Sequence, residues 1–359
     1  MKIAVNNVDL IRELNLLEKI VGKKPTIPVL ANVLIQTADM GTLVLSATDL
    51  EIGLVGACPA DVLESGSATL PARKLTELVR AQSDDKIMLE SGPRGAVIFT
   101  SGKFKSRLQT LPSGDFPKIP LVEGHPAIKL PRALKGMIAQ VRYAISDKEG
   151  RHFMKGALLS FREGQGLLMA ATEGARLSVT EIPFGSEGWE PVLLPAKALD
   201  ELAALLSEEG TGDITFARSD RHLFFELDGR LFISRQIEGK FPDYERIIPT
   251  QNEHRMVIER AAFASMLRRF VLIDEVVVLQ LKENSLELSA ASAEVGDGVE
   301  AVTALYEGPE IELRYKAQFL LDFLTTALSD TVTMDIKDIH TPVLFTDGNF
   351  FNVIMGMRM

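Results

Sequence analysis

The sequence contains a single cysteine, Cys58, among 359 residues, so no disulfide can form within the chain. Its five histidines are isolated, and no cysteine or histidine cluster has the spacing of a zinc site. No apolar run approaches the roughly 20 residues of a membrane-spanning helix, and the N-terminus lacks the apolar core of a signal peptide. We therefore expect a cytoplasmic protein with no metal, no cofactor and no membrane partner.

The sequence motifs of common catalytic and nucleotide-binding sites are also missing. The patterns GxxxxGK[ST], GxGxxG, GxSxG and HExxH do not occur. The closest glycine run, GQG at 164–166, leads into a predicted strand rather than into a helix N-terminus. Carboxylates are plentiful but scattered, so no acid–base pair can be assigned. We predict no catalytic residues, and the missing motifs argue against an enzyme.

Length and composition are those of a folded protein with more than one core. Hydrophobic residues make up 46% of the chain and charged residues 25%, which is usual for globular proteins. At 359 residues the chain exceeds the size at which one hydrophobic core stops growing, so we expect two or three domains. The net charge of −10 argues at first against a nucleic-acid partner, but an average does not show where the charges lie.

Several phrases recur along the chain at a nearly constant interval, which indicates an internal repeat. GDFPKIP (114–120) returns as GKFPDYERIIP (239–249), so that Phe116 and Phe241 lie 125 positions apart. Two further phrases occur three times each. One reads LVLSATDLEIGL (43–54), LLMAATEGARLSV (167–179) and LELSAASAEVGDGV (286–299), and the other reads LPARKLTELVRA (70–81), LPAKALDELAAL (194–205) and RYKAQFLLDFLTTAL (314–328). The chain is therefore predicted to hold three copies of one unit.

Each copy has the same order of predicted elements. A helix with apolar spacing comes first, at 6–20, 131–145 and 259–273. Pro131 suits the first turn of its helix, where a missing N–H costs nothing. Two strands joined by a polar turn follow, then a second helix that starts near Pro71 or Pro195, then alternating strands. We expect an α+β fold of antiparallel sheets with two helices per copy. The predicted domains are 1–121, 122–249 and 250–359.

Positive charge is concentrated on the six predicted helices. Together these helices carry a net charge of +5, whereas the whole chain carries −10. The main contributors are Arg73, Lys74, Arg80, Arg132, Lys135, Arg142, Lys197, Arg268 and Arg269. If all six helices face the same way, they form a weakly basic surface that contacts phosphate without reading bases. The alternative is that these charges simply lie on ordinary solvent-exposed helix faces with no partner. Judged by charge alone, this alternative is favoured over a phosphate-contacting surface.

These motifs, in this order, resemble one known family over the whole chain: the bacterial DNA sliding clamp, the β subunit of DNA polymerase III. The resemblance rests on KPTIPVLANVLI (24–35), SATDLEIG (46–53), LPARKL (70–75), LPSGDFP (111–117), ATEGARL (171–177), FPDYERIIP (241–249) and VIMGMRM (353–359). The threefold repeat is also what that family shows.

The resemblance implies a head-to-tail homodimer of six α+β domains around a central hole, with helices lining the ring and antiparallel sheets outside. Such a ring holds duplex DNA, whatever its sequence, by topology rather than by affinity, so modest basic charge on the inner helices suffices. Family likeness places Lys24, Arg73, Lys148 and Lys197 at or beside the DNA. With the charged helix residues, the expected DNA-binding set is Lys24, Arg73, Lys74, Arg80, Arg132, Lys135, Arg142, Lys148 and Lys197.

The resemblance also implies a hydrophobic cleft between copies two and three. It binds short linear peptides from the replicative polymerase, the clamp loader and repair proteins, and so supports processive DNA replication without catalysis. Methionine-rich walls suit such a cleft because flexible side chains repack around different partners. Arg176, Arg246 and Arg358 are candidates to bind polar peptide atoms. The expected cleft residues are Met154, Thr172, Gly174, Ala175, Arg176, Leu177, Pro242, Arg246, Ile247, Phe319, Val343, Val353, Ile354, Met355, Gly356, Met357 and Arg358.

The sequence departs from the family pattern at several of these places. EGAR (173–176) stands where the family usually has Asp-Gly-His-Arg, and Gly356 replaces a proline. The loss of an imidazole and of a rigid proline is expected to loosen and reshape the cleft. The segment 274–278 is shorter than usual and lacks an aromatic residue, and Ser106 stands where an interface aromatic residue is common.

Three alternatives to a main processivity clamp remain at this point. The first is a second, specialised clamp copy for repair or inhibitor tolerance. The second is a monomeric peptide-binding scaffold. The third is an enzyme on a triplicated scaffold, whose catalytic acids are hidden among the 49 carboxylates of the sequence.

Overall fold

The computed structural model describes residues 1–22, 25–38, 41–146, 152–162, 166–185, 189–206 and 210–357. They fall into two compact units. The first unit comprises Met1–Arg132 and Lys197–Gln236, and the second comprises Ala133–Ala196 and Ile237–Met359. The middle domain predicted from the sequence is therefore divided between the units, and the predicted boundaries at 121 and 249 stay predictions. None of the described helices is long and apolar enough to cross a membrane.

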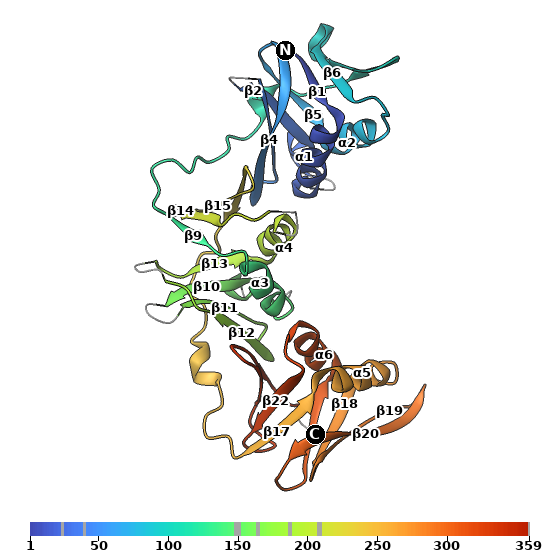
Figure 1. Cartoon of the computed structure of the whole chain (residues 1–359), viewed down its shortest axis with the longest axis vertical. Helices are drawn as coiled ribbons and strands as arrows, with labels where there is room; N and C mark the ends of the chain where they lie inside the picture. The colour runs from blue at the N-terminus through green and yellow to red at the C-terminus, as the bar shows by residue number, and fades with distance from the viewer. Residues whose placement is uncertain are drawn as a thin grey trace. The chain divides into compact units, whose positions relative to one another are not determined.

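The first unit holds one antiparallel sheet and three helices in its described residues (Figure 1). The strand path is β8-β7-β6-β1-β4-β16-β15-β14-β9, and β2, β3 and β5 join it through β4. The strands are β1 (Lys2–Asn6), β2 (Asn32–Ala38), β3 (Thr42–Thr48), β4 (Ile52–Glu64), β5 (Ser67–Pro71), β6 (Lys86–Ser91), β7 (Val97–Ser101), β8 (Phe104–Leu108), β9 (Ala127–Leu130), β14 (Ile214–Arg218), β15 (His222–Leu227) and β16 (Arg230–Arg235). The helices are α1 (Asn7–Ile20), α2 (Ala72–Arg80) and α4 (Ala196–Leu205).

Local sequence explains why α1 starts and how it is buried. The side chain of Asn6 accepts a hydrogen bond from the backbone N–H of Val8 at 2.9 Å, which caps the helix N-terminus. Leu10, Leu14 and Leu17 recur at helical spacing and are buried. Figure 1 shows α1 beside α2, and the two helices contact each other.

The second unit has the same plan. Its strand path is β13-β10-β11-β12-β24-β23-β22-β17-β20-β19-β18-β21, again antiparallel. The strands are β10 (Gly156–Arg162), β11 (Gly166–Thr172), β12 (Arg176–Ile182), β13 (Val192–Pro195), β17 (His254–Glu259), β18 (Val276–Lys282), β19 (Ser285–Ser292), β20 (Gly296–Tyr306), β21 (Ile311–Lys316), β22 (Thr331–Ile336), β23 (Val343–Asp347) and β24 (Phe350–Ile354). The helices are α3 (Leu134–Arg142), α5 (Arg260–Phe270) and α6 (Ala317–Thr326), and α5 packs on α6.

One predicted helix begins later than the sequence suggested. The structure starts α3 at Leu134, so the prediction that Pro131 lies in the first helical turn is wrong. Arg132 lies in the turn before the helix, where its guanidinium makes two hydrogen bonds to the carboxylate of Asp228, at 3.0 and 2.9 Å. No side chain caps α3 at Ala133. The ion pair of Arg132 therefore holds a segment that apolar spacing alone would assign to the helix.

The threefold repeat appears in the structure as a repeated strand junction. In the first unit β16 pairs with β4, with Ile233 opposite Gly53. In the second unit β24 pairs with β12, with Val353 opposite Leu177. These pairs stand at equivalent places in successive copies, and each continues a sheet across a boundary predicted from the sequence. The recurring phenylalanines are equivalent as well, because Phe116 and Phe241 are both buried.

A buried ion pair reinforces the junction in the first unit. The carboxylate of Glu13 on α1 accepts two hydrogen bonds from the guanidinium of Arg230 on β16, at 2.9 and 2.8 Å. Both side chains are more than nine-tenths buried. Gly56 lies so close that a Cβ atom there would be 2.4 Å from Glu13 Oε2. The pair therefore joins a helix of the first copy to a strand of the second.

Cys58 lies beside this pair and is buried, as expected for a structural thiol. Burial, together with the carboxylates of Glu13 and Asp9, raises the pKa of Cys58 to about 12. Since the thiolate is the reactive form, the thiol is inert while the first unit is folded and reports its unfolding.

We predict that Glu13→Gln lowers the stability of the first unit by about 3–5 kcal/mol, because Arg230 is left buried without its counter-charge. The measurement is the urea concentration at which Cys58 becomes accessible to a thiol reagent. Lys86→Gln is the matched control: it removes one member of the solvent-exposed pair of Lys86 with Asp61 and is expected to cost about 1 kcal/mol or less. Equal effects of the two variants would contradict the prediction.

Candidate functional site

The C-terminal segment after β24 is docked on the second unit by two backbone hydrogen bonds. The N–H of Met355 donates to the carbonyl of Ala175 at 3.0 Å, and the N–H of Met357 donates to the carbonyl of Arg314 at 2.8 Å. Met355, Gly356 and Met357 are exposed. The segment is thus fixed by its backbone while it presents two methionine side chains to solvent.

A groove with a volume of about 940 Å³ runs along this segment. Its size is that of a typical ligand site. It is lined by the tail, by β21 with the residues just before it, and by the turn 339–342. The lining residues are Glu310, Ile311, Glu312, Leu313, Arg314, Ile339, His340, Thr341, Pro342, Met355, Gly356 and Met357. Of these, the sequence had predicted only the three tail residues.

The turn between β11 and β12 is built around one threonine. The hydroxyl of Thr172 donates to the carbonyl of Arg176 at 2.7 Å and accepts from the N–H of Gly174 at 3.1 Å. Gly174 has φ +97°, a conformation that favours glycine. The neighbouring Ala175 is exposed and supplies the carbonyl that holds the tail.

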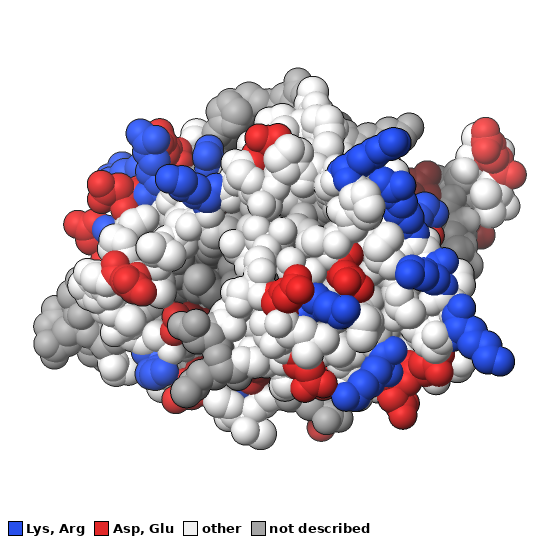
Figure 2. Space-filling model, turned by 90° about the horizontal axis from the view of Figure 1, so that it is seen from above, with Lys and Arg blue, Asp and Glu red and all other residues white. Residues whose placement is uncertain are grey.

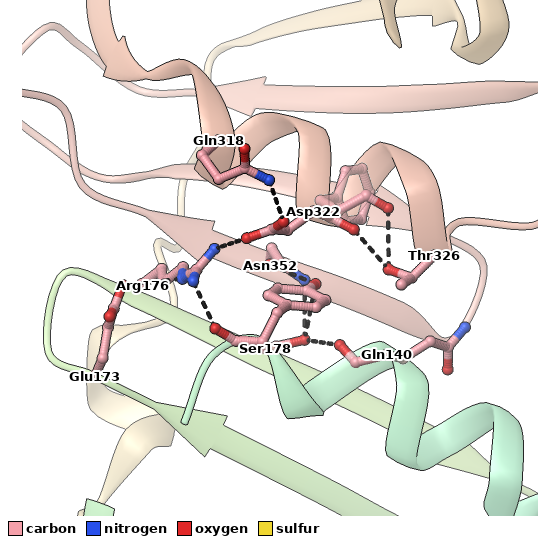
Figure 3. Close-up of polar contacts among 10 residues, drawn as sticks. Gln140, Glu173, Arg176, Ser178, Gln318, Asp322, Thr326 and Asn352 are labelled. Atoms are coloured by element: carbon pink, nitrogen blue, oxygen red, sulfur yellow. Dashed lines mark hydrogen bonds and ion pairs between the residues drawn. The ribbon is translucent and has the colours of Figure 1, made fainter. Parts of the chain in front are cut away.

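Arg176 is buried, and its guanidinium points toward other residues of the second unit (Figure 3). Its guanidinium donates to Asp322 Oδ2 and to the carbonyl of Tyr143, each at 2.5 Å, and forms an ion pair with Glu173 at 2.9 Å. It also lies over the ring of Phe319, 4.3 Å from the centroid. The guanidinium of Arg176 therefore already has partners within the protein, and the suggestion that it binds polar peptide atoms stays a prediction. Arg176 joins β12 to α6.

A chain of polar side chains continues this junction. The hydroxyl of Tyr143 donates to Asn352 Oδ1 at 3.0 Å, and Asn352 Nδ2 donates to Ser178 Oγ at 3.1 Å. Ser178 Oγ donates in turn to the carbonyl of Gln140 at 2.6 Å. Burial raises the pKa of Tyr143 to about 12, so it stays a hydrogen-bond donor at neutral pH. These contacts connect α3, β12 and β24 (Figure 3).

The remaining predicted cleft residues divide by exposure. Met154, Thr172, Leu177, Val343, Val353 and Ile354 are buried, Pro242 and Phe319 are partly buried, and Arg246 and Ile247 are exposed. Leu177 and Val353 pack in one cluster with Phe241, whereas Val343 and Ile354 belong to the core of the last copy. The buried apolar residues thus belong to cores of the second unit and do not line the groove. Arg358 lies outside the described residues.

Most predicted DNA-facing residues that the structure describes have partners within their own unit. Lys74 donates to Glu77 at 2.7 Å and lowers the pKa of that carboxyl. Arg80 donates to Asn15 at 2.8 Å, and Lys197 pairs with Asp49. These contacts reduce the free positive charge on the helices.

The other described basic residues of the predicted set differ in exposure. Lys135 is exposed on α3, and Arg73 and Arg142 are partly buried. Lys24 and Lys148 lie outside the described residues. Figure 2 shows one face of the molecule, on which lysines and arginines are interspersed with carboxylates. No group of His, Cys, Asp or Glu in the described part of the chain could hold a metal ion.

Comparison with protein families matches nearly the whole chain to one family. The N-terminal, central and C-terminal domains of the DNA polymerase III beta subunit match residues 1–120, 130–243 and 245–358. The beta sliding clamp of Synechocystis is 32% identical over 376 residues, covering 96% of this chain and 95% of the relative. That of Escherichia coli K12 is 29% identical over 372 residues and covers both chains completely.

Solved structures give the same result. The crystal structure of the DNA polymerase III subunit beta from Pseudomonas aeruginosa has a TM-score of 0.94 at 28% identity, with full coverage of both chains. A sliding clamp from Bartonella birtlesii bound to griselimycin has a TM-score of 0.94 at 30% identity, also with full coverage. These matches confirm the predicted fold of three tandem α+β clamp-type domains.

We predict that Arg176→Met destabilises the second unit by about 3–5 kcal/mol, because Asp322 and Glu173 lose their buried counter-charge. Trp189, the only tryptophan of the chain, lies in this unit, so its fluorescence during urea unfolding is the measurement. Arg246→Met is the control, since it breaks an exposed pair with Asp243 and is expected to cost about 1 kcal/mol or less. An Arg176 variant as stable as this control would refute the role of Arg176.

Proposed function

Because the chain belongs to the DNA polymerase III beta subunit family and is a sliding clamp of DNA replication, we propose that two copies close head to tail around duplex DNA. The ring tethers the replicative polymerase and gives it processivity. The observation that carries this proposal is the pair of unpaired strand edges that the repeat leaves at its two ends.

The last strand of each copy is available to pair with the copy that precedes it in the ring. β16 supplies this strand to β4, and β24 supplies it to β12. The equivalent strand of the first copy is β8, which ends the sheet of the first unit. The equivalent acceptor in the last copy is the first half of β20, whose outer edge pairs with no described strand before Ala304. Exposed edges of this kind favour pairing with another chain.

The two edges are complementary in charge and in polarity. Lys103, Lys105 and Arg107 lie on or beside β8, whereas Glu294, Asp297 and Glu300 lie on or beside the start of β20. Both edges also expose apolar side chains: Phe104 on β8, and Leu272, Val295 and Val299 at the other edge. Because the two surfaces differ, pairing is heterologous, and a closed dimer satisfies both edges of both chains.

The register follows from the two junctions within the chain. In both hairpins that end a copy, the strand begins directly after a two-residue turn, at Arg230 and Phe350. The equivalent residue of the first copy is Phe104. If β8 pairs in the same register as β16 and β24, Arg107 lies directly opposite Asp297 of the partner subunit. Lys105 then lies diagonally across from the same aspartate. An opposite-charge pair facing across two strands stabilises their pairing.

A closed ring does not require strong DNA binding. Many phosphate contacts make binding depend steeply on salt and hold a protein in place, whereas a clamp has to slide. The paired state of Lys74, Arg80 and Lys197 is consistent with weak contact. We assign these residues, with Lys24, Arg73, Arg132, Lys135, Arg142 and Lys148, to the sequence-independent DNA surface. The clamp is a cytoplasmic, non-catalytic accessory subunit in this proposal.

We assign the groove along the tail to short linear peptides of polymerases, the clamp loader and repair proteins. Met355 and Met357 supply flexible apolar walls, and Ile247 and Arg246 extend the exposed surface. A relative with full-length similarity has been solved with griselimycin bound, which supports a ligand site in this family. Gly356 adds no rigidity here, so the peptide preference is expected to differ from that of clamps with proline.

The alternatives gain no support from the comparisons. A monomeric scaffold has no use for complementary strand edges, and an enzyme has no match among the families that cover the chain. A specialised second copy shares all of these features and differs only in its partners.

We predict that the protein, once placed on nicked circular DNA by a clamp loader, stays bound during gel filtration but is lost after the circle is cut. Topology explains this difference, since cutting creates an end without changing the local contacts. The measurement is the amount of protein that elutes with each DNA form. Equal loss from circular and linear DNA would refute encirclement.

The ring itself is tested by charge reversal at the proposed interface, with solution mass by light scattering at micromolar concentration as the readout. Arg107→Glu is expected to lower the mass from that of two chains toward one and to abolish retention on circles, because like charges then face each other. Combining it with Asp297→Arg is expected to restore both. Arg94→Glu, at an exposed site outside β8, is the control. A dimeric Arg107 variant would contradict the register.

We predict that Met355→Ala weakens binding of a fluorescent peptide from a clamp-binding polymerase by about tenfold, since it removes one apolar anchor of the groove. Fluorescence anisotropy measures the dissociation constant. Pro242→Ala is expected to act in the same direction. Leu328→Ala, which shortens an exposed leucine outside the groove, is the control. Unchanged binding by both the Met355 and the Pro242 variant would move the peptide site elsewhere.

A further inference from the structure

The first unit contains a small hollow that none of the functions above uses. Its volume is about 80 Å³, enough for two or three water molecules at roughly 30 Å³ each. It lies where the turn between β3 and β4, the segment after Phe116, and strands β15 and β16 meet. The lining residues are Thr48, Leu50, Glu51, Ile52, Gly53, Pro117, Lys118, Ile119, Pro120, His222, Ile233 and Arg235.

The hollow has the same construction as the tail groove of the second unit. It lies at the equivalent place one copy earlier in the repeat. Thr48 Oγ1 donates to the carbonyl of Ile52 at 2.8 Å and accepts from the N–H of Leu50 at 3.0 Å. Thr172 makes the same two contacts with the residues four and two positions after it. The two turns therefore share one hydrogen-bond pattern.

The strand that follows is held in the same way in both places. The N–H of Arg235 donates to the carbonyl of Glu51 at 2.8 Å, just as the N–H of Met355 donates to that of Ala175. Counting from the hairpin pairs that begin at Arg230 and Phe350, Arg235 is the repeat equivalent of Met355. The hollow and the tail groove thus have equivalent backbone frames.

The side chains on this frame differ in charge. Arg235 stands in place of Met355, and Lys118 follows the recurring Phe-Pro pair where Asp243 does in the next copy. His222 occupies the position of Pro342, counted back along the same hairpins. Glu51 is the only carboxylate among the lining residues. The same backbone frame therefore carries methionine side chains at the tail groove and cationic and imidazole side chains at the smaller hollow.

The electrostatics of His222 agree with an excess of positive charge. Burial, and then the guanidinium groups of Arg235 and Arg221, lower the pKa of His222. The imidazole is thus neutral at pH 7 and offers one N–H donor. Apolar walls from Leu50, Ile119 and Ile233 complete the hollow.

We propose that this hollow binds the carboxylate of an acidic side chain presented by a linear peptide, with Arg235 and Lys118 as the charged partners. The apolar walls receive the methylene groups of that side chain, and the peptide backbone lies along the rim. A phosphate dianion suits the site less well, because its second negative charge is repelled by Glu51 and it has no methylene groups to place against the apolar walls. The inference stands apart from ring closure and from the tail groove.

The test uses methyl NMR of the full chain with labelled isoleucines, in the absence of DNA and clamp loader. The probes are N-acetyl-Leu-Glu-Leu-amide and the same peptide with glutamine. The glutamate peptide is expected to shift the methyl signals of Ile52, Ile119 and Ile233, with a dissociation constant at least about tenfold lower than that of the glutamine peptide.

Arg235→Met, which installs the residue of the equivalent site, is expected to abolish this preference, and Lys118→Met is expected to weaken it. Unchanged isoleucine signals elsewhere show that the variants are folded. Arg221→Met is the matched control, because Arg221 is a neighbouring arginine that does not line the hollow. It is expected to keep the glutamate preference.

Three results would overturn the proposal. The first is no shift of these methyl signals at about 10 mM peptide, near the weakest affinity such a titration detects. The second is equal binding of the two peptides, or a glutamate preference that survives Arg235→Met. The third is an equal shift with inorganic phosphate, which would make the hollow a general anion site. None of these outcomes bears on DNA retention, so this proposal and the clamp proposal fail separately.

Discussion

The pairing of one antiparallel strand with the next copy of the repeat is the constraint on which the structure depends. β16 on β4 and β24 on β12 carry each sheet across a domain junction by backbone hydrogen bonds. These bonds need no particular side chain, so the junction survives although the copies share few residues. A strand edge left open costs unsatisfied N–H and C=O groups and invites another chain. Three copies in a row make two junctions and leave one donor edge and one acceptor edge, which are the edges that the proposed head-to-tail dimer joins.

Charged side chains then fix each internal junction, and they do so differently in the two units. Glu13 on α1 binds Arg230 on β16, whereas Arg176 on β12 binds Asp322 on α6. In both cases a helix of one copy is tied to a strand of its neighbour. A buried pair adds little net stability compared with apolar packing, but it penalises any arrangement that separates its members. The pairs therefore select one orientation of neighbouring copies, while the backbone ladder and the apolar cores supply the stability.

Much of this architecture is visible in the sequence because it is periodic. The repeated phrases predicted three copies and the second helix of each, and apolar spacing predicted the first helix of each, since burial acts on every third or fourth residue of a helix. The start of α3 was missed because one ion pair, from Arg132 to Asp228, overrides that spacing locally. Tyr143, Asn352 and Ser178 were missed because single polar residues carry no period, and their partners are distant in the sequence. The groove residues 339–342 were missed for the same reason.

The repeat also separates what the backbone decides from what the side chains decide. In the turns at Thr48 and Thr172, the threonine hydroxyl makes the same two contacts with peptide groups, and in the first turn Asp49 Oδ1 also accepts from the N–H groups of Glu51 and Ile52. The residues whose carbonyls hold the following strand, Glu51 and Ala175, use only their main chain for that purpose. Their side chains, and those of Arg235 and Met355, are free of any part in holding the frame. One frame therefore supports an apolar groove in one place and a cationic hollow in another, and the fold alone does not determine which ligand each position receives.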